Sequence, residues 1–196
     1  MMKLSIITVV YNDPFGLEKT IDSVIKQKNK NYEYLIIDGE SSSATQNVIK
    51  KYRRFIDQLI SEKDKGTYFA MNKGIDLSCN EIITFLNAGD TVEKDYVENI
   101  LNNISFHDYI YSGVNLIFKN NKIKKYLPKK ITQKTEYLQR MPFPHPGLAV
   151  KKKCFELIGK FNTNKKITAD HYWVVSLIRS NLSGIRGNYI SINFEV

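Results

Sequence analysis

Short apolar segments alternate with segments of helical periodicity throughout the first half of the chain. The apolar segments are 4–10, 34–37, 58–61 and 82–86, and helical segments begin near residues 14, 41–45 and 67. This alternation is typical of a sheet whose strands run parallel, because each helix carries the chain back across one face of the sheet. The sequence therefore predicts an α/β protein with a mostly parallel central sheet and helices on both faces.

The second half of the chain has a looser pattern. A smaller antiparallel element is expected there, with strands near 109–118 and 123–127. A helix near 172–178 and a last strand near 190–196 are expected to follow. No linker rich in Pro, Gly or Ser divides the 196 residues. We expect a single domain, 1–196, with 1–104 as one half and 105–196 as the other.

The composition excludes several classes of protein. Hydrophobic residues make up 42% of the chain and charged residues 25%, which argues against disorder or a fibre. The apolar runs are much shorter than the ~20 residues that a membrane span needs. Cys79 and Cys154 form no C-x-x-C pair, so we expect two reduced thiols in a cytoplasmic protein.

The net charge of +9 is concentrated in the second half of the chain. Residues 1–98 hold 13 Lys and Arg against 15 Asp and Glu, whereas residues 99–196 hold 16 against 5. Two interpretations stay open. The lysines form a solvated surface, or they attract an anionic membrane face or a phosphate-bearing acceptor.

Polar clusters follow the predicted strands at the point where each strand ends, at 11–13, 38–41, 61–66 and 87–90. Because open α/β sheets bind ligands beyond the carboxyl ends of their strands, these clusters predict a nucleotide pocket at one edge of the sheet. Asp38 and Asp64 would accept hydrogen bonds from a base or a ribose. Asn72, on the helix behind them, would donate one.

Asp90 ends the apolar strand that begins at residue 82. A carboxylate at this tip is placed to hold a divalent cation over the phosphates of a ligand. The alternative is local, because Asn-Ala-Gly-Asp at 87–90 also suits a strand-to-helix turn. Asp90 or Thr91 would then cap a helix over 92–104.

Five motifs in this order resemble those of the family 2 glycosyltransferases, which have the GT-A fold. They are 5–12, 37–39, 62–66 with 70–74, 85–90, and 145–150 with 161 and 167–170. The resemblance covers nearly the whole chain. It implies transfer of a sugar, with inversion, from a nucleotide-diphosphate sugar to a hydroxyl acceptor, with Mg²⁺ or Mn²⁺ as cofactor.

The resemblance also implies partners and a cellular setting. The acceptor would be a glycan or a lipid-linked sugar in the assembly of a bacterial surface polysaccharide, such as a capsule, an exopolysaccharide or a lipopolysaccharide. Independently of the resemblance, the two thiols indicate a cytoplasmic protein, and the basic second half leads to a separate hypothesis of peripheral contact with the anionic inner face of the cell membrane. No specific nucleic acid would be a partner.

Single residues receive roles from the same resemblance. Asp170 would be the base that takes the acceptor's proton, although it also suits an N-terminal cap of the helix that follows it. His145, held between two prolines, would approach the metal or the diphosphate, although a lone His is more often structural. Asp90 would bind the metal. The residues expected to bind the nucleotide sugar are Thr8, Tyr11, Asp38, Asp64, Asn72 and Asn87.

The chain departs from the family pattern at two places. Residues 38–45 lack one carboxylate and one glycine of the usual Asp-Gly-x-Ser-x-Asp-Gly-Thr, and Asn87 and Gly89 leave Asp90 as the only acid of the metal motif. Two rival functions stay open. A nucleotidyltransferase would need a Gly-rich, basic first loop, which residues 11–14 do not offer. A non-catalytic nucleotide or nucleic-acid binding module is suggested by the pI of about 9.4.

Overall fold

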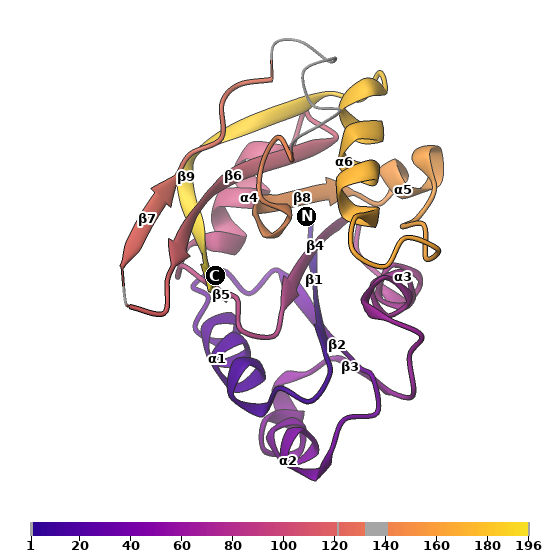
Figure 1. Ribbon diagram of the computed structural model, residues 1–196. Helices are drawn as coiled ribbons and strands as arrows, with labels where there is room; N and C mark the ends of the chain where they lie inside the picture. Colours follow the sequence, from indigo (N-terminus) through magenta and orange to yellow (C-terminus); the bar gives the residue numbers. More distant parts are fainter. Residues whose placement is uncertain (1, 121, 132–140, 196) are drawn as a thin grey trace.

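The computed structural model describes residues 2–120, 122–131 and 141–195. Its strands form one sheet in the order β3-β2-β1-β4-β8-β6-β9-β5, and β7 pairs with β6 (Figure 1). In chain order the elements are β1 (Leu4–Val10), α1 (Pro14–Ile25), β2 (Tyr32–Asp38), α2 (Ser43–Tyr52), η1 (Arg53–Phe55), β3 (Gln58–Ser61), α3 (Thr67–Leu77), β4 (Ile82–Asn87), β5 (Thr91–Val92), α4 (Tyr96–Ile104), β6 (Tyr109–Ile117), β7 (Ile123–Tyr126), η2 (His145–Gly147), β8 (Leu148–Lys151), α5 (Lys153–Ile158), α6 (Ala169–Arg179) and β9 (Gly184–Glu195).

The first four strands build the parallel part of the sheet. β1 lies between β2 and β4, and β3 extends the sheet beyond β2, with all three pairings parallel. In this register Val10 lies beside Asp38, and Asp38 lies beside Ser61. The carboxyl ends of these strands therefore meet at one edge, which confirms the parallel sheet predicted from the βα alternation.

The second half of the chain extends the sheet beyond β4. β8 is antiparallel to β4 and β6, β7 is antiparallel to β6, and β5 is antiparallel to β9. β6 and β9 pair in parallel, which differs from the antiparallel arrangement expected for this half. The chain passes through α5 and α6 between these two strands. A helical crossover of this length allows it to return in the same direction.

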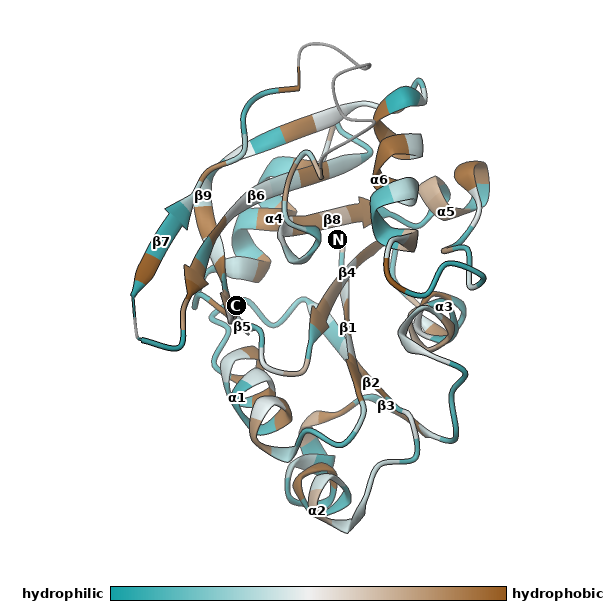
Figure 2. Cartoon of the chain, in the orientation of Figure 1, coloured by the Kyte–Doolittle hydropathy of each residue, from teal (hydrophilic) through white to brown (hydrophobic). Residues whose placement is uncertain are grey.

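The sheet carries a hydrophobic core on each face. Successive residues of β1 point to opposite faces, so Ile6 packs with α1, α2 and α4 while Ile7 packs with α3, α5 and α6. Leu17 and Ile100 contribute to the first core, and Trp173 contributes to the second. Figure 2 shows hydrophobic residues in brown along β4 and β8, in the middle of the sheet. Burial on both faces explains why these strands are continuous apolar runs.

The helices are short, and each buries one face. α1 has 12 residues and begins after Asp13, whose side chain accepts a hydrogen bond from the Gly16 N–H at 2.8 Å. Pro14 at the first helical position suits this start, because its missing N–H would have no partner there. Within the described ranges, none of the helices has both the length and the apolar character needed to span a bilayer.

The region after Asp90 differs from the expected helix over 92–104. Thr91 and Val92 form the short strand β5 and pair with Asn193 and Ile192 of β9, and α4 begins only at Tyr96. Neither Asp90 nor Thr91 therefore caps a helix. β-branched residues fit a strand once a partner strand is present, and that partner comes from the far end of the chain.

Two other bounds differ from expectation. α6 begins at Ala169, three residues before the expected start at residue 172. β9 begins at Gly184, six residues before the expected start at residue 190. Residue 196, the expected end of the last strand, lies outside the described residues.

Candidate active site

Hydrogen bonds join the loops that follow β1 and β2. Asn12 donates its backbone N–H to Ser41 Oγ at 2.8 Å, and its side-chain oxygen accepts from the Ser42 N–H at 2.8 Å. Asn12 has φ of 53° and Glu40 has φ of 63°, a left-handed conformation that Asn adopts more readily than most residues. The two loops are thereby held together at the carboxyl edge of the sheet.

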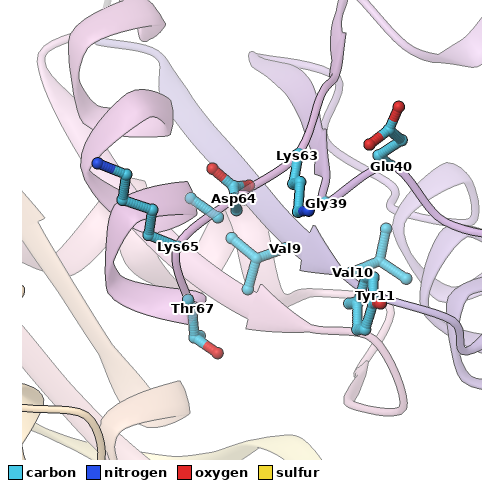
Figure 3. Close-up of a pocket in the computed structure, with 11 residues that line it drawn as sticks. Val9, Val10, Tyr11, Gly39, Glu40, Lys63, Asp64, Lys65 and Thr67 are labelled. Atoms are coloured by element: carbon cyan, nitrogen blue, oxygen red, sulfur yellow. The ribbon is translucent and has the colours of Figure 1, made fainter.

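A cavity of about 580 Å³ lies between these loops and the beginning of α3. We call it the strand-end cavity. Figure 3 shows Tyr11 and Glu40 on the side of the loops, and Asp64 and Thr67 on the side of α3. Tyr11 is 70% exposed, so a large aromatic ring stands uncovered at the cavity. This volume and mixed lining suit a ligand of nucleotide size.

Asp64 presents an unsatisfied acceptor in the strand-end cavity. Its side chain is 8% exposed, and one carboxylate oxygen pairs with Lys73 Nζ. Lys73 also binds Glu62 Oε1 at 2.6 Å. The other oxygen, Asp64 Oδ2, is buried and has no hydrogen-bond partner. Because a buried acceptor without a partner is destabilising, Asp64 is prepared to accept a bond from an N–H or O–H of a ligand.

Asp38 is fully buried beneath the loop, away from the strand-end cavity. Its Oδ2 accepts hydrogen bonds from Gln46 Nε2 and Ser61 Oγ, both at 2.6 Å, and the Ser41 N–H lies 3.2 Å away. All of these donors belong to the protein. The carboxylate therefore holds the loop after β2 in place, and its position does not support the expected contact with a base or ribose.

Thr8 and Asn72 also lie away from the strand-end cavity. Thr8 is fully buried, with its hydroxyl 3.0 Å from that of Tyr34. Asn72 donates from Nδ2 to the Phe161 carbonyl at 2.9 Å and accepts from the Phe161 N–H at 3.1 Å. Both polar atoms of the Asn72 amide thus join α3 to the segment before α6. Thr8 and Asn72 thus bond to other parts of the protein, and neither is among the residues that line the strand-end cavity.

A second cavity, of about 500 Å³, lies beside the beginning of α6. We call it the His145 cavity. Asn87, His145 and Asp170, three residues that the sequence singled out, line it together. Thr67 lines both this cavity and the strand-end cavity, so the two share a boundary. Most of the remaining lining is apolar and includes Met71, Leu116, Met141, Pro144, Ile167 and Phe194.

Asp170 lies in the first turn of α6, and Thr168 occupies the N-cap position instead. The Tyr68 hydroxyl lies 2.8 Å from Asp170 Oδ1 and 3.0 Å from the Ile167 carbonyl oxygen, both of which accept. Burial, together with the hydrogen bond to Asp170, raises the pKa of Tyr68 to about 12. Tyr68 therefore keeps its proton at neutral pH and donates it toward the Asp170 carboxylate.

His145 is packed among aromatic rings. Its ring centre lies 5.7 Å from those of Phe85 and Phe161, and the residue is 9% exposed. Burial lowers the pKa of His145 below its ordinary value of 6.5, while the Asp170 carboxylate acts in the opposite direction. His145 is therefore neutral at neutral pH. Near it, Asn87 Oδ1 is a buried oxygen with no hydrogen-bond partner.

Several lining residues were not singled out from the sequence. Lys63 and Lys65 line the strand-end cavity, and Lys166 lines the His145 cavity. The one available signal for Lys63 and Lys65 is that they flank Asp64 in a family motif. Tyr68 gave no signal of its own, because its partner Asp170 lies 102 positions later in the chain.

The family model for glycosyl transferase family 2 matches residues 5–173, from β1 to the middle of α6. The chain belongs to this family. The match includes the residues of both cavities up to Asp170, so family membership and the site geometry refer to the same part of the molecule.

Individual members of family 2 resemble the chain to different extents. The UDP-Glc:alpha-D-GlcNAc-diphosphoundecaprenol beta-1,3-glucosyltransferase WfgD of Escherichia coli is 32% identical over 98% of this chain and 77% of its own length. The poly(ribitol-phosphate) beta-N-acetylglucosaminyltransferase TarP of Staphylococcus aureus is 34% identical over 52% of this chain and 33% of its own. The first curated relatives are longer, and the chain spans only 15% to 40% of their length.

A solved structure of a bacterial protein shares the fold. The crystal structure of residues 1–349 of S. aureus TarS in complex with UDP-GlcNAc superposes with a TM-score of 0.79 at 16% identity, over 100% of this chain and 59% of that one. At this identity the likeness concerns the fold alone. It confirms the GT-A fold that the sequence predicted.

Asp90 and His145, the predicted ligands of a divalent cation, do not line the same cavity. Asp90 is 4% exposed, its Oδ2 accepts from the Asn87 N–H at 3.1 Å, and it is not among the residues of the His145 cavity. Among the described residues, no group of three or more His, Cys, Asp or Glu side chains is placed to hold a metal ion. The Asp90 carboxylate instead braces the turn after β4. The side chains present do not form a prepared cation site.

Proposed function

We propose that this family 2 chain transfers a sugar, with inversion, from a uridine-diphosphate sugar to a hydroxyl group of an acceptor. The observation that carries the proposal is the boundary that the two cavities share at Thr67. A donor in the strand-end cavity and an acceptor in the His145 cavity would meet there. Tyr68, the next residue, is bonded to Asp170, so the candidate base lies close to this meeting point.

The strand-end cavity offers groups that suit a nucleotide diphosphate. Asp64 Oδ2 would accept a hydrogen bond from the base or ribose, and the exposed ring of Tyr11 would stack on the base. The ammonium groups of Lys63 and Lys65 would balance part of the diphosphate charge. Two comparisons favour uridine, because WfgD is named for UDP-Glc and the TarS structure contains UDP-GlcNAc.

Asp170 is the candidate general base. Its carboxylate would take the proton of the acceptor hydroxyl while that oxygen bonds to the anomeric carbon, and the bond from this carbon to the diphosphate breaks. The diphosphate takes the electrons of the broken bond and leaves from the face of the sugar opposite the attacking oxygen. The configuration of the anomeric carbon is therefore inverted. The buried Asn87 Oδ1 would accept a hydrogen bond from a sugar hydroxyl in the same cavity.

The acceptor proposed is a lipid-linked sugar of bacterial surface polysaccharide assembly. The largely apolar lining of the His145 cavity suits an acceptor with an apolar portion. The name of WfgD specifies a diphosphoundecaprenol-linked sugar, and that of TarP specifies poly(ribitol-phosphate). Both of these relatives therefore act on glycan or polymer acceptors of bacteria.

The proposal is tested by replacing the candidate base. In Asp170→Asn we expect kcat to fall by roughly 1000-fold, because the amide cannot take the acceptor's proton. The rise in melting temperature caused by UDP should be unchanged, since Asp170 does not line the strand-end cavity. The measurements are transfer from a panel of UDP-sugars and thermal unfolding with and without UDP.

Asp76→Asn is the matched control, because Asp76 also lies on the surface of a helix, where it pairs with Lys160, and lines neither cavity. This variant should retain full turnover. Turnover of Asp170→Asn at the rate of the unaltered protein would refute the role of Asp170 as base. Absence of any UDP-dependent stabilisation would refute the donor site itself.

A further inference from the structure

Residues 118–131 form a basic segment that the proposed active site does not use. Within it, β7 and its flanking loops carry six lysines and no Asp or Glu, namely Lys119, Lys122, Lys124, Lys125, Lys129 and Lys130. We call this segment the lysine hairpin; residue 121 lies outside the described part. In Figures 1 and 2, β7 lies at the outside of the molecule and carries both teal and brown bands.

The lysines of this hairpin are exposed and have no acidic partner in the part of the chain that the structure describes. All six are solvent-exposed, and among the described residues none lies within 4.0 Å of a carboxylate oxygen. By contrast, Lys51, Lys73, Lys153 and Lys160 elsewhere on the surface all form ion pairs. The positive charge of the hairpin is therefore not neutralised within the described structure, and it is available to an external anion.

Two large apolar side chains stand among these lysines. Ile123 is 58% exposed and Leu127 is 56% exposed. Because alternate residues of a strand share a face, Ile123 and Lys125 project on one side of β7, and Leu127 follows directly after the strand. A surface that combines ammonium groups with exposed aliphatic side chains matches a phospholipid interface, where anionic headgroups cover apolar chains. Nucleic acid would use the charges but would gain little from Ile123 and Leu127.

The hairpin lies one strand away from the acceptor site. Lys124 pairs in register with Leu116 of β6, and Leu116 lines the His145 cavity together with Asp170. Phe194 of β9, the partner of Leu116 on its other side, lines the same cavity. A membrane held against β7 would therefore lie next to the cavity in which we place the acceptor.

We infer that the lysine hairpin docks on the anionic phospholipid surface of a membrane and so presents the His145 cavity to a lipid-linked acceptor. The acceptor part of this inference rests on the proposed function, whereas the docking part stands on the hairpin alone. A docked protein diffuses along the membrane surface, where the lipid-linked acceptor is also held. Transfer to a membrane-borne acceptor therefore depends on the hairpin, and transfer to a short acceptor free in solution does not.

Vesicle sedimentation tests the docking. The unaltered protein should sediment with vesicles of about 30% phosphatidylglycerol in phosphatidylcholine, and not with pure phosphatidylcholine, at about 50 mM salt. The variant Lys122→Gln/Lys124→Gln/Lys125→Gln should show a partition coefficient roughly 100-fold lower, since each lysine near an anionic surface contributes a factor of about five. Ile123→Ser/Leu127→Ser should also bind more weakly, with all six lysines retained.

The control removes three positive charges elsewhere. Lys50→Gln/Lys51→Gln/Arg54→Gln changes exposed residues of α2 and η1, which connect β2 to β3 at the other end of the strand order from β7. This variant should sediment like the unaltered protein. Unchanged sedimentation of the hairpin variant would overturn the inference. The inference would also be overturned if the hairpin variant kept its vesicle binding but self-associated. That result would show that the lysines only block edge-to-edge pairing of β7. Tighter binding to duplex DNA than to the anionic vesicles would also overturn it.

Failure of the docking and failure of the proposed function give different results. Sedimentation is measured without any sugar donor, so it does not depend on catalysis. Transfer to a short acceptor in solution, measured without vesicles, does not depend on docking. The hairpin variant should keep this transfer and lose transfer to the membrane-borne acceptor, whereas Asp170→Asn should lose both and still sediment.

Discussion

Tyr68 is the residue on which the geometry of the candidate base depends. It is 9% exposed, its ring lies 5.7 Å from that of Phe161, and its hydroxyl is bonded to Asp170. Burial is the main cause that raises the pKa of Tyr68 to about 12. The hydroxyl therefore keeps its proton, and remains a hydrogen-bond donor, at neutral pH. If Asp170 is the base, we expect Tyr68 to act on the acceptor through it, as a positioning residue.

Replacing Tyr68 by Phe keeps the ring and removes the hydroxyl, which donates to Asp170 Oδ1 and to the Ile167 carbonyl oxygen. We expect kcat to fall by about 10-fold, because a carboxylate free to rotate is less often aligned with the acceptor hydroxyl. The KM for donor should stay constant, since Tyr68 does not line the strand-end cavity. Steady-state kinetics with separate kcat and KM values check this. An unchanged kcat would show that Asp170 is oriented without Tyr68.

At the scale of elements, α3 joins the two cavities. Its first residue, Thr67, lines both of them, and Lys73 near its end pairs with Asp64. Asn72 fastens the helix to Phe161 through two hydrogen bonds, which span 89 positions of sequence. The helix therefore connects the halves 1–104 and 105–196 at the place where donor and acceptor would meet.

The link through Asn72 can be measured as stability. Asn72→Ala removes both hydrogen bonds and leaves the Phe161 N–H and carbonyl without partners. We expect the free energy of unfolding to fall by about 2 to 3 kcal/mol, from roughly 1 kcal/mol per hydrogen bond plus the unsatisfied backbone groups. Urea unfolding provides the measurement. The control is Asn103→Ala, at an exposed position of α4. It should change the free energy of unfolding by less than about 0.5 kcal/mol. Equal effects of the two substitutions would contradict the role of Asn72.

At the scale of the whole molecule, His145 is buried where the two halves of the chain pack together. Its ring stacks on Phe85 of β4, from the first half, and meets Phe161, from the second, edge to face. Burial lowers its pKa below 6.5, although Asp170 partly opposes this shift. The folded protein therefore binds a proton at His145 less readily than the unfolded chain does.

This difference makes global stability depend on pH. Because the pKa of His145 is lower in the folded state, its contribution is fully present above pH 6.5, the ordinary His value, and is lost as the pH falls toward the folded pKa. Unfolding free energies measured at steps from pH 7.5 down to 5 should decline less steeply in His145→Gln than in the unaltered protein. His107 and His171 are present in both proteins, so they cancel in the comparison. Parallel declines would show that His145 titrates as it does in the unfolded chain.

Local pattern predicted most of the elements. β3 and α3 were expected at the bounds that the structure has, because strand alternation and helical periodicity are determined by residues close together in sequence. The motifs singled out Asn87, His145 and Asp170 in different roles, and the structure adds that these three residues line one cavity. The parallel pairing of β6 and β9 was missed, since strand direction depends on the path of the chain between the two strands.

The sequence by itself determined the α/β alternation, the family and the edge of the sheet at which the polar residues collect. Only the tertiary structure decided which of those residues face a cavity. Asp38 accepts hydrogen bonds from Gln46 and Ser61, and Asp90 accepts one from the Asn87 N–H, whereas Asp64, which lines the strand-end cavity, has one buried oxygen without a hydrogen-bond partner. All three are carboxylates near the ends of strands, so their residue type is the same. Their roles differ because the folded chain brings different donors to each carboxylate, such as Ser61 of the neighbouring strand β3 for Asp38 and the Asn87 N–H of its own turn for Asp90.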